Sequence, residues 1–326
     1  MSLTETLDRF QQRHTWAGFP LAVIYKYADD QGAFLAALIT YYGFLSLFPL
    51  LLLVVTILGF ALDGNPHLKQ HFIDSALNQF PGVGQQLGKV TSLQGNTLAL
   101  VVGVLGSLYG ALGVAQAGQN ALNRVWAVPR HRRPNPFMSR MRSLLFLLVI
   151  GAGLLLTTGV SILATFAESL GAHLDVLLRA PMLVLAVAVN VGLFMVAMRV
   201  LTAKDVSWSD VLPGAALSGV AWQLLQELGK YYVAHQINGS TTTYGIFAVV
   251  LGLLAYIYLA AVIVVLSAEV NVVRAEKLWP RSLLTAFTDD AELTPADRKA
   301  YRSYPESERH KEFEQVDVRF EQDATD

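Results

Sequence analysis

A long stretch without charge dominates the sequence: no acidic or basic side chain occurs in the 32 residues from Gln31 to Leu62. A helix needs about 20 apolar residues to cross the hydrocarbon core of a bilayer. Five more charge-poor stretches follow, at 97–123, 143–167, 180–198, 211–226 and 241–273. The pattern therefore predicts an all-α membrane protein that crosses the bilayer several times.

The composition agrees with this interpretation. Hydrophobic residues make up 53% of the chain and charged residues 15%, and the mean hydropathy is +0.43. A soluble domain has about 25% charged residues. The absence of cysteine excludes disulfides, thiolate metal sites, iron–sulfur clusters and a cysteine nucleophile. Residues 1–30 lack the apolar core of a cleaved signal peptide, so we expect the first span to act as an uncleaved anchor.

Six helices fit the pattern, and we expect a bundle of six transmembrane helices near 34–62, 97–125, 143–167, 181–203, 210–234 and 244–273. Together they make one transmembrane domain, 34–273, in which 63–96 is a long outer segment. The fifth helix is long enough only if Glu227 and Lys230 are included.

Two further segments flank this domain. Residues 1–33 are expected to contain an interfacial helix at 14–30, with Trp16, Tyr25 and Tyr27 at the level of the lipid headgroups. Residues 274–326 form an acidic tail, since residues 289–326 alone hold twelve acidic and six basic side chains. Because this tail has few large apolar residues, it is predicted to be largely disordered and solvated.

The placement of lysine and arginine predicts the orientation, because short cytoplasmic loops retain positive charge. With the N-terminus inside, the cytoplasmic segments hold fourteen of these residues and the outer segments four. Both termini are therefore expected to face the cytoplasm, with the chain in a bacterial cytoplasmic (inner) membrane. The bilayer is the expected partner, with anionic lipid at the basic loop 124–142. No nucleic acid partner is expected, and the oligomeric state is left open.

Three stretches resemble the YihY/BrkB family of membrane proteins. They are AALITYYGFLSLFPLLLLVV in the first span, YGALGVAQAGQNALNRVW in the second and YGIFAVVLGLLAYIYLAAVIVVLSAEVNVV in the last. The resemblance covers about residues 20–280, with Tyr256 where the family often has Trp and Ser267 where it often has Gly. It implies a six-span bundle of the inner membrane. It leaves the function open, since that family carries ribonuclease, virulence-factor and transporter-like labels.

Hydroxyl groups and a proline cluster in the first span, at Tyr41, Tyr42, Ser46 and Pro49. Proline in a helix removes the hydrogen bond to the carbonyl of Leu45, which a nearby hydroxyl or another helix can satisfy. The group is either a kink that lines a substrate path or a kink that serves helix packing.

The second span carries a stripe of amides, Gln116, Gln119, Asn120 and Asn123, at helical spacing. Four glycines between 103 and 113 precede it and are predicted to let two helices approach closely. The amides can either hydrogen-bond a polar solute or join neighbouring helices, and the sequence does not favour one of these roles.

The fifth span places Gln223, Gln226, Glu227 and Lys230 within two turns. A charge near the middle of the membrane costs at least about 2.5 kcal/mol, so such residues are expected to face the bundle interior or water. A substrate path is one interpretation. A polar turn at the outer interface, with Lys230 reaching toward the headgroups, is the other.

Glu269 and Asn271 lie near the end of the last span, and Arg274 follows about one turn later, where it could neutralise Glu269. The carboxylate is either a protonatable or cation-binding group or part of a buried ion pair that orders the helices. If the amides of the second span and the polar group of the fifth face one cavity, they mark a polar route across the bilayer.

No catalytic constellation is recognisable. The seven histidines are scattered, and neither an H-E-x-x-H motif nor a dinucleotide fingerprint occurs. We therefore expect no enzymatic activity, no metal and no cofactor. The leading hypothesis is a transport or export component for a polar or lipid-like solute, and the alternative is a non-transporting scaffold or envelope-integrity protein.

Overall fold

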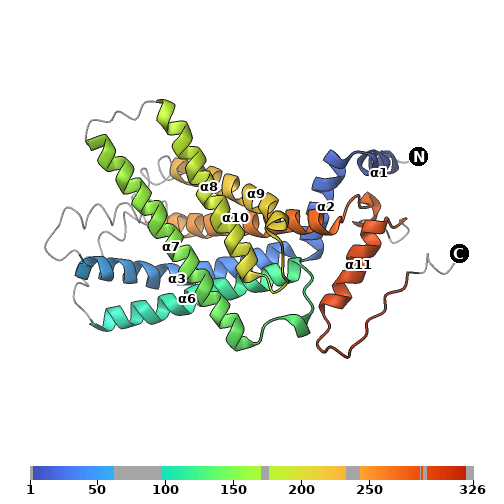
Figure 1. Ribbon diagram of the computed structural model, residues 1–326, viewed down its shortest axis with the longest axis horizontal. Coiled ribbons are helices and arrows are strands. Elements are labelled where there is room, and N and C mark those ends of the chain that lie inside the picture. The colour runs from blue at the N-terminus through green and yellow to red at the C-terminus, as the bar shows by residue number, and fades with distance from the viewer. Residues whose placement is uncertain are drawn as a thin grey trace.

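The computed structural model describes residues 3–61, 97–169, 176–232, 243–286, 288 and 292–320. Within these ranges all regular secondary structure is helical. Six long helices cross in one bundle (Figure 1): α3 (Gly32–Ala61), α6 (Thr97–Val125), α7 (Pro136–Ser169), α8 (Val176–Leu201), α9 (Trp208–Tyr232) and α10 (Thr243–Glu276). Each lies where a charge-poor stretch predicts a helix. The predicted outer segment 63–96 lies outside the described residues.

Four of these helices are long and apolar enough to cross a membrane: Val101–Val125, Pro136–Gly153, Val184–Leu201 and Val250–Glu276. The part of α3 whose side chains the structure describes, Gly32–Leu47, is a shorter apolar helix. Large apolar side chains such as those of Phe34, Leu105 and Leu148 point outward and are exposed. An outward apolar surface suits a lipid environment, because lipid tails are as apolar as these side chains and no hydrophobic effect drives them into the interior.

Helices α3 and α6 pack closely against each other, and glycine makes this approach possible. A Cβ atom at Gly110 would lie 2.5 Å from the Cβ of Ser46, and one at Gly113 would lie 2.2 Å from the ring of Tyr42. Two of the four glycines, Gly110 and Gly113, thus act in helix packing, as their spacing predicts. A similar contact joins α9 to α10, where a Cβ at Gly214 would lie 2.0 Å from the carbonyl oxygen of Ser267.

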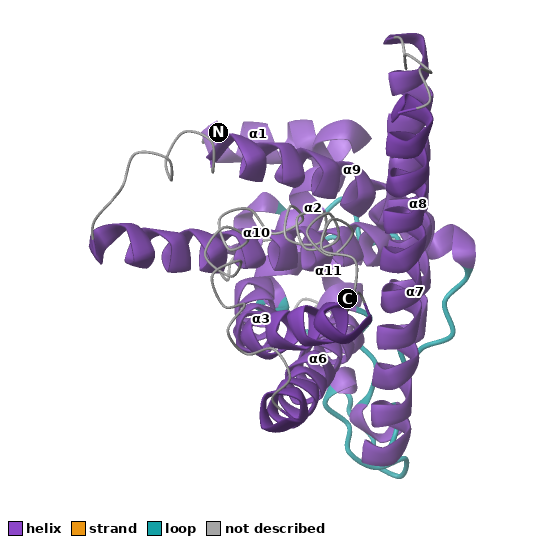
Figure 2. Cartoon of the chain, turned by 90° about the vertical axis from the view of Figure 1, so that its left-hand side faces the viewer, coloured by secondary structure: helices purple, strands orange, loops and turns teal. Residues whose placement is uncertain are grey.

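One end of the bundle gathers the polar and charged residues, and we call it the polar end. There the C-terminal part of α6 meets the loop after α8, since Asn123 Oδ1 accepts a hydrogen bond of 2.7 Å from the backbone N–H of Ala203. Arg142 of α7 donates to the carbonyl of Thr202 at 3.1 Å. Three shorter helices, α1 (Leu3–Arg13), α2 (Thr15–Asp29) and α11 (Pro295–Ser307), also lie at this end (Figures 1 and 2).

The interfacial helix expected at 14–30 corresponds to α2. Trp16 on this helix is 71% exposed, and its place at headgroup level stays a prediction. Tyr25 and Tyr27 are half-buried instead. The hydroxyl of Tyr25 donates to the carbonyl of Leu283 at 2.7 Å, so this side chain serves packing at the polar end rather than contact with lipid.

The acidic tail differs from the expectation of disorder, because α11 lies within it. Thr294 caps this helix in a capping box with Asp297, and Pro295 occupies the first turn. Arg281 is 1% exposed and pairs with Asp297 and with Asp29, at 2.7 Å each. These pairs join the tail to the end of α2, a contact that composition alone does not reveal.

Candidate functional site

Three fully buried ionisable side chains meet at the polar end, and we call them the buried cluster: Lys26, Asp30 and Glu269. Lys26 and Asp30 are 1% exposed and Glu269 is 0% exposed. The ammonium of Lys26 donates to Asp30 and, at 3.2 Å, to the carbonyl of Val125. Glu269 Oε2 lies 3.8 Å from the same ammonium. Helices α2, α6 and α10 therefore converge on one cation.

Local backbone geometry positions Asp30. The residue caps α2 and its N–H bonds to the carbonyl of Lys26 at 2.9 Å, while Gln31 has a φ of 58° that ends the helix. Gly32 then starts α3, and a Cβ there would lie 2.3 Å from the ring of Tyr27. The turn between α2 and α3 can thus be tight. It brings the carboxylate of Asp30 back toward Lys26, which lies one helical turn earlier.

The buried cluster is not fully satisfied. Within the described part of the chain, Asp30 Oδ1 and both carboxylate oxygens of Glu269 have no hydrogen-bond donor. Arg124 Nε is 3.9 Å from Asp30 Oδ1, an ion pair without a hydrogen bond. Burial raises the pKa of Asp30, although Lys26 and Arg124 oppose this effect. An unpaired charge in such a setting is costly, so the cluster needs a functional or chemical explanation.

The sequence pattern points to Glu269 but not to Lys26 and Asp30. Their i, i+4 spacing is a signal for a pair on one helix face, but the aromatic residues of the same segment favour an interfacial helix. Arg274, the expected neutralising partner of Glu269, donates to the carbonyl of Ser209 at 3.0 Å instead. The cation beside Glu269 is Lys26, because the fold packs α2 against α10.

The predicted amides of α6 make contacts between helices. Gln119 Nε2 donates to the carbonyl of Ser139 at 2.9 Å and to Ser143 Oγ at 2.8 Å, and Gln116 donates to Ser139 Oγ at 2.7 Å. Both glutamines thus tie α6 to α7. Asn123 bonds to the loop after α8, as described above. Asn120 is exposed.

The other predicted residues are spread over the bundle. Asn271 Oδ1 accepts from the N–H of Gly214 at 2.6 Å, which ties α10 to α9. Ser46 donates to the carbonyl of Gly43 at 2.8 Å, within its own helix. Tyr41 is exposed and stands edge-on to Tyr42, with ring centroids 5.2 Å apart.

On α9, Gln223 and Gln226 are half-buried and Glu227 is exposed. The side chains of Pro49 and Lys230 fall outside the described residues.

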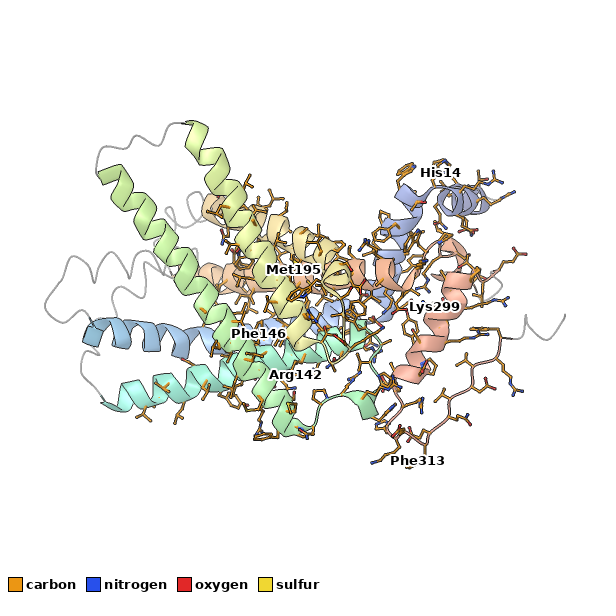
Figure 3. The ribbon with its side chains drawn as sticks, in the orientation of Figure 1. His14, Arg142, Phe146, Met195, Lys299 and Phe313 are labelled. Atoms are coloured by element: carbon orange, nitrogen blue, oxygen red, sulfur yellow. The ribbon has the colours of Figure 1, made fainter. Side chains whose placement is uncertain are left out.

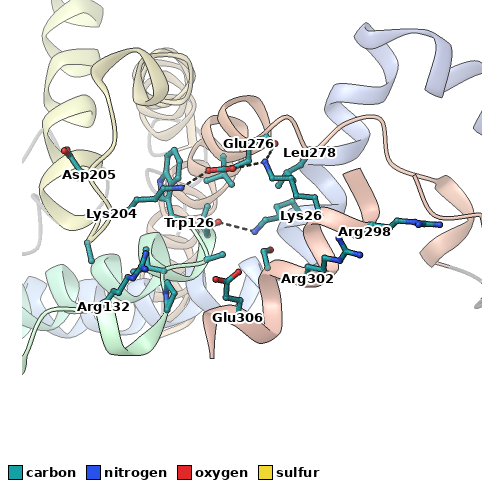
Figure 4. A pocket seen from close by; sticks show the side chains of 18 of the residues that line it. Lys26, Trp126, Arg132, Lys204, Asp205, Glu276, Leu278, Arg298, Arg302 and Glu306 are labelled. Carbon is teal, nitrogen blue, oxygen red and sulfur yellow. Dashed lines mark hydrogen bonds and ion pairs between the residues drawn. The ribbon is translucent and has the colours of Figure 1, made fainter. Parts of the chain in front are cut away.

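A cleft of about 780 Å³ opens between the bundle and α11, and we call it the cationic cleft (Figure 4). Its lining includes six basic and three acidic side chains: Lys26, Arg132, Lys204, Arg298, Lys299 and Arg302, with Asp205, Glu276 and Glu306. Glu276 bridges two of the bases, because it pairs with Lys204 at 2.7 Å and with Lys299 at 2.9 Å. The surplus of positive charge favours anions.

A second cavity of about 370 Å³ lies within the bundle, and we call it the apolar cavity. Phe146, Phe194 and Trp222 are among its lining side chains, and Asn190 is the only residue in the lining with a polar amide. Figure 3 shows Phe146 within the bundle, away from Lys299 at the polar end. Val125 lines both cavities, so they adjoin at the end of α6. The amides of α6 do not line the cationic cleft or the apolar cavity, and neither do Gln223 and Gln226 of α9.

Comparison with known proteins places these features in a family. Residues 23–286 match the family described as virulence factor BrkB. A UPF0761 membrane protein of Methylibium petroleiphilum is 28% identical over 289 residues, which cover 82% of this chain and 64% of that protein. The chain thus spans less than two thirds of that relative's length.

Two further relatives are more distant. A putative ribonuclease-like protein, YfkH of Bacillus subtilis, is 24% identical over 76% of this chain and 91% of its own. An uncharacterized protein of Dickeya dadantii is 25% identical over 72% of this chain and 76% of its own. No solved structure matches the chain. Among the described residues, no group of three or more His, Asp or Glu side chains is arranged to hold a metal ion. The match over residues 23–286, together with the apolar helices that carry it, shows that the chain belongs to the virulence factor BrkB family of membrane proteins.

Proposed function

We propose that this protein is a transport or export component of the cytoplasmic membrane for a polar or lipid-like solute. The observation that carries the proposal is the pair of adjoining cavities: an apolar one within the bundle and a cationic one at its polar end. Cavities that accept small molecules are typically concave and apolar, with a few charged groups that orient the ligand. A molecule with an apolar tail and an anionic head would match both.

The proposal includes the full topology. All six long helices cross the membrane, and the polar end with both termini faces the cytoplasm. Two features support this: the six helices alternate in direction along the bundle (Figure 1), and the basic residues collect at the polar end. Short loops on the cytoplasmic side of a membrane carry an excess of lysine and arginine.

The test uses purified protein in liposomes that contain a fluorescent short-chain phosphatidylglycerol, which is anionic, or the matching phosphatidylcholine, which is zwitterionic. A membrane-impermeant quencher reports how fast each probe changes leaflet. We expect the protein to accelerate the anionic probe more than the zwitterionic one. Equal rates with and without protein, for both probes, would overturn the transport role.

Two pairs of variants separate the cavities. Arg132→Ala removes a base from the cationic cleft, and Arg140→Ala removes an exposed base that lines neither cavity. Ala260→Phe fills part of the apolar cavity, and Ala152→Phe adds the same ring at an exposed position. We expect Arg132→Ala and Ala260→Phe to lower the rate at which the anionic probe changes leaflet. The controls Arg140→Ala and Ala152→Phe should leave that rate unchanged.

A non-transporting scaffold is the alternative function. It is favoured by the amides, because Gln116, Gln119 and Asn123 all bond to neighbouring elements of the bundle. A scaffold would leave both probes unaffected while the protein stays folded. No enzymatic step is part of either role, and the word ribonuclease-like describes YfkH rather than this chain.

A further inference from the structure

The buried cluster has too few donors for its acceptors. The ammonium of Lys26 directs hydrogen bonds to Asp30 and to the carbonyl of Val125. Its distance of 3.8 Å to Glu269 exceeds the length of a hydrogen bond. The fully buried Glu269 therefore has no described donor on either oxygen, and one oxygen of Asp30 also lacks one.

The charges are unbalanced as well. With every group ionised, the buried cluster contains two carboxylates and one ammonium. Arg124 on α6 is the nearest further cation to Asp30, but it is one third exposed and also pairs with Glu308 at 3.0 Å. One carboxylate would then be ionised in a buried site without a hydrogen bond, and an uncompensated buried charge is strongly destabilising.

The remaining neighbours do not supply a positive charge. On α11, the ring of Tyr304 lies 5.4 Å from the ammonium of Lys26, and its hydroxyl donates to Asp29 at 2.8 Å. Tyr27 of α2 lies near both Glu269 and Tyr258 of α10, and Asp29 adds a further negative charge near Glu269. Burial raises the pKa of both Tyr27 and Tyr304, so these phenols stay neutral at physiological pH.

A proton resolves both problems. The carboxyl groups of Asp30 and Glu269 face the same nitrogen, because the ammonium of Lys26 donates to Asp30 and lies 3.8 Å from Glu269 Oε2. If Glu269 carries a proton, its O–H can donate to the free oxygen of Asp30, and the surplus charge disappears. A metal cation fits less well, because the ammonium of Lys26 already supplies a positive charge beside both carboxylates.

We propose that Asp30 and Glu269 form a proton-binding site that holds one shared proton and exchanges it with the cytoplasm by way of the cationic cleft. Lys26 lines that cleft while Glu269 does not. Asp30 does not line the cleft either, so a proton leaving the carboxyl pair passes to Lys26 as its ammonium releases one to water in the cleft, and Lys26 ends protonated as it began. The site assigns the proton as the coupling ion of transport, and this assignment rests on the transport role proposed above.

The site itself is tested by infrared spectroscopy of the purified protein, in which a protonated carboxylic acid absorbs apart from carboxylates. We expect one such band near neutral pH. Glu269→Gln and Asp30→Asn should each remove it, because either variant leaves one carboxylate for one ammonium. Glu276→Gln, which alters a carboxylate with two cationic partners, should retain it. A folded wild-type protein without the band, or a band that survives both substitutions, would overturn the proposal.

The coupling is tested separately in liposomes. With a transported probe, a pH gradient should change the rate for the wild type and not for Glu269→Gln. A rate that follows a sodium gradient instead would overturn the proton as coupling ion. If no probe is transported but the infrared band behaves as expected, the transport role fails and the proton site stands.

Discussion

Arg281 provides a direct test of whether the acidic tail is docked onto the bundle. Its guanidinium is buried between Asp297 of the tail and Asp29 at the end of α2. Burial acts to lower the pKa of Arg281, but the hydrogen bond to Asp297 and the charge of Asp29 raise it above its ordinary value. The substitution Arg281→Met keeps an apolar stem of similar length and removes the charge.

The expected magnitude follows from these contacts. Removing one partner of a buried ion pair costs about 3–5 kcal/mol. Asp297 keeps a hydrogen bond of 2.9 Å from the N–H of Ser282 and one of 2.8 Å from Thr294 Oγ1, so it is not left without donors. We therefore expect the lower end, about 3 kcal/mol, which corresponds to about a 100-fold larger population of the undocked tail.

Hydrogen–deuterium exchange of the α11 amides measures this population. In Arg281→Met we expect their exchange to accelerate about 100-fold, while amides in the bundle helices change little. The control Arg319→Met breaks a pair whose two side chains are largely exposed, and it should cost about 1 kcal/mol at most. If α11 of the wild type already exchanges like an unstructured peptide, or if Arg281→Met changes nothing, the docked tail is refuted.

Three further predictions concern packing, pH and topology. Gly113→Ala should destabilise the protein by about 1–3 kcal/mol in thermal or detergent unfolding through overpacking, whereas Gly151→Ala, whose Cβ meets nothing within 4 Å, should not. Burial acts to raise the pKa of Glu308, but its hydrogen bond with Arg130 contributes to an overall lowering. Its stabilisation is therefore present above the unfolded-state pKa and lost as pH falls through the folded one; acidification should speed exchange at the end of α11, and Glu308→Gln should remove that dependence. Because the chain has no cysteine, a single Arg132→Cys should react with an impermeant maleimide from the cytoplasmic side only, and labelling from the outside would contradict the orientation.

Much of the helical framework can be predicted from the sequence. Charge-poor stretches locate the six long helices because a bilayer requires apolar side chains over the length of a span. The glycines at 110 and 113 predict a close helix contact because backbones approach only where no Cβ intervenes. Charge-poor stretches and glycine spacing can each be recognised within one continuous segment of the chain.

The roles of the polar residues are much less accessible from the sequence. The amides of α6 were equally compatible with a solute path and with helix contacts, and Ser139 and Ser143 become their partners only once α7 lies alongside. The tail composition predicts disorder, yet the buried Arg281 of the tail pairs with Asp29 at the end of α2. In each case the partner lies outside the segment from which the prediction was made.

A helical membrane protein of the BrkB family can be recognised from the amino-acid order alone, because hydropathy and motif are properties of continuous segments. That Lys26, Asp30 and Glu269 share one buried site depends on how the helices pack in three dimensions. The reason is physical: the energy of a buried charge depends on which groups the fold brings within a few ångströms and on how much water it excludes, and neither is encoded in any single stretch of chain.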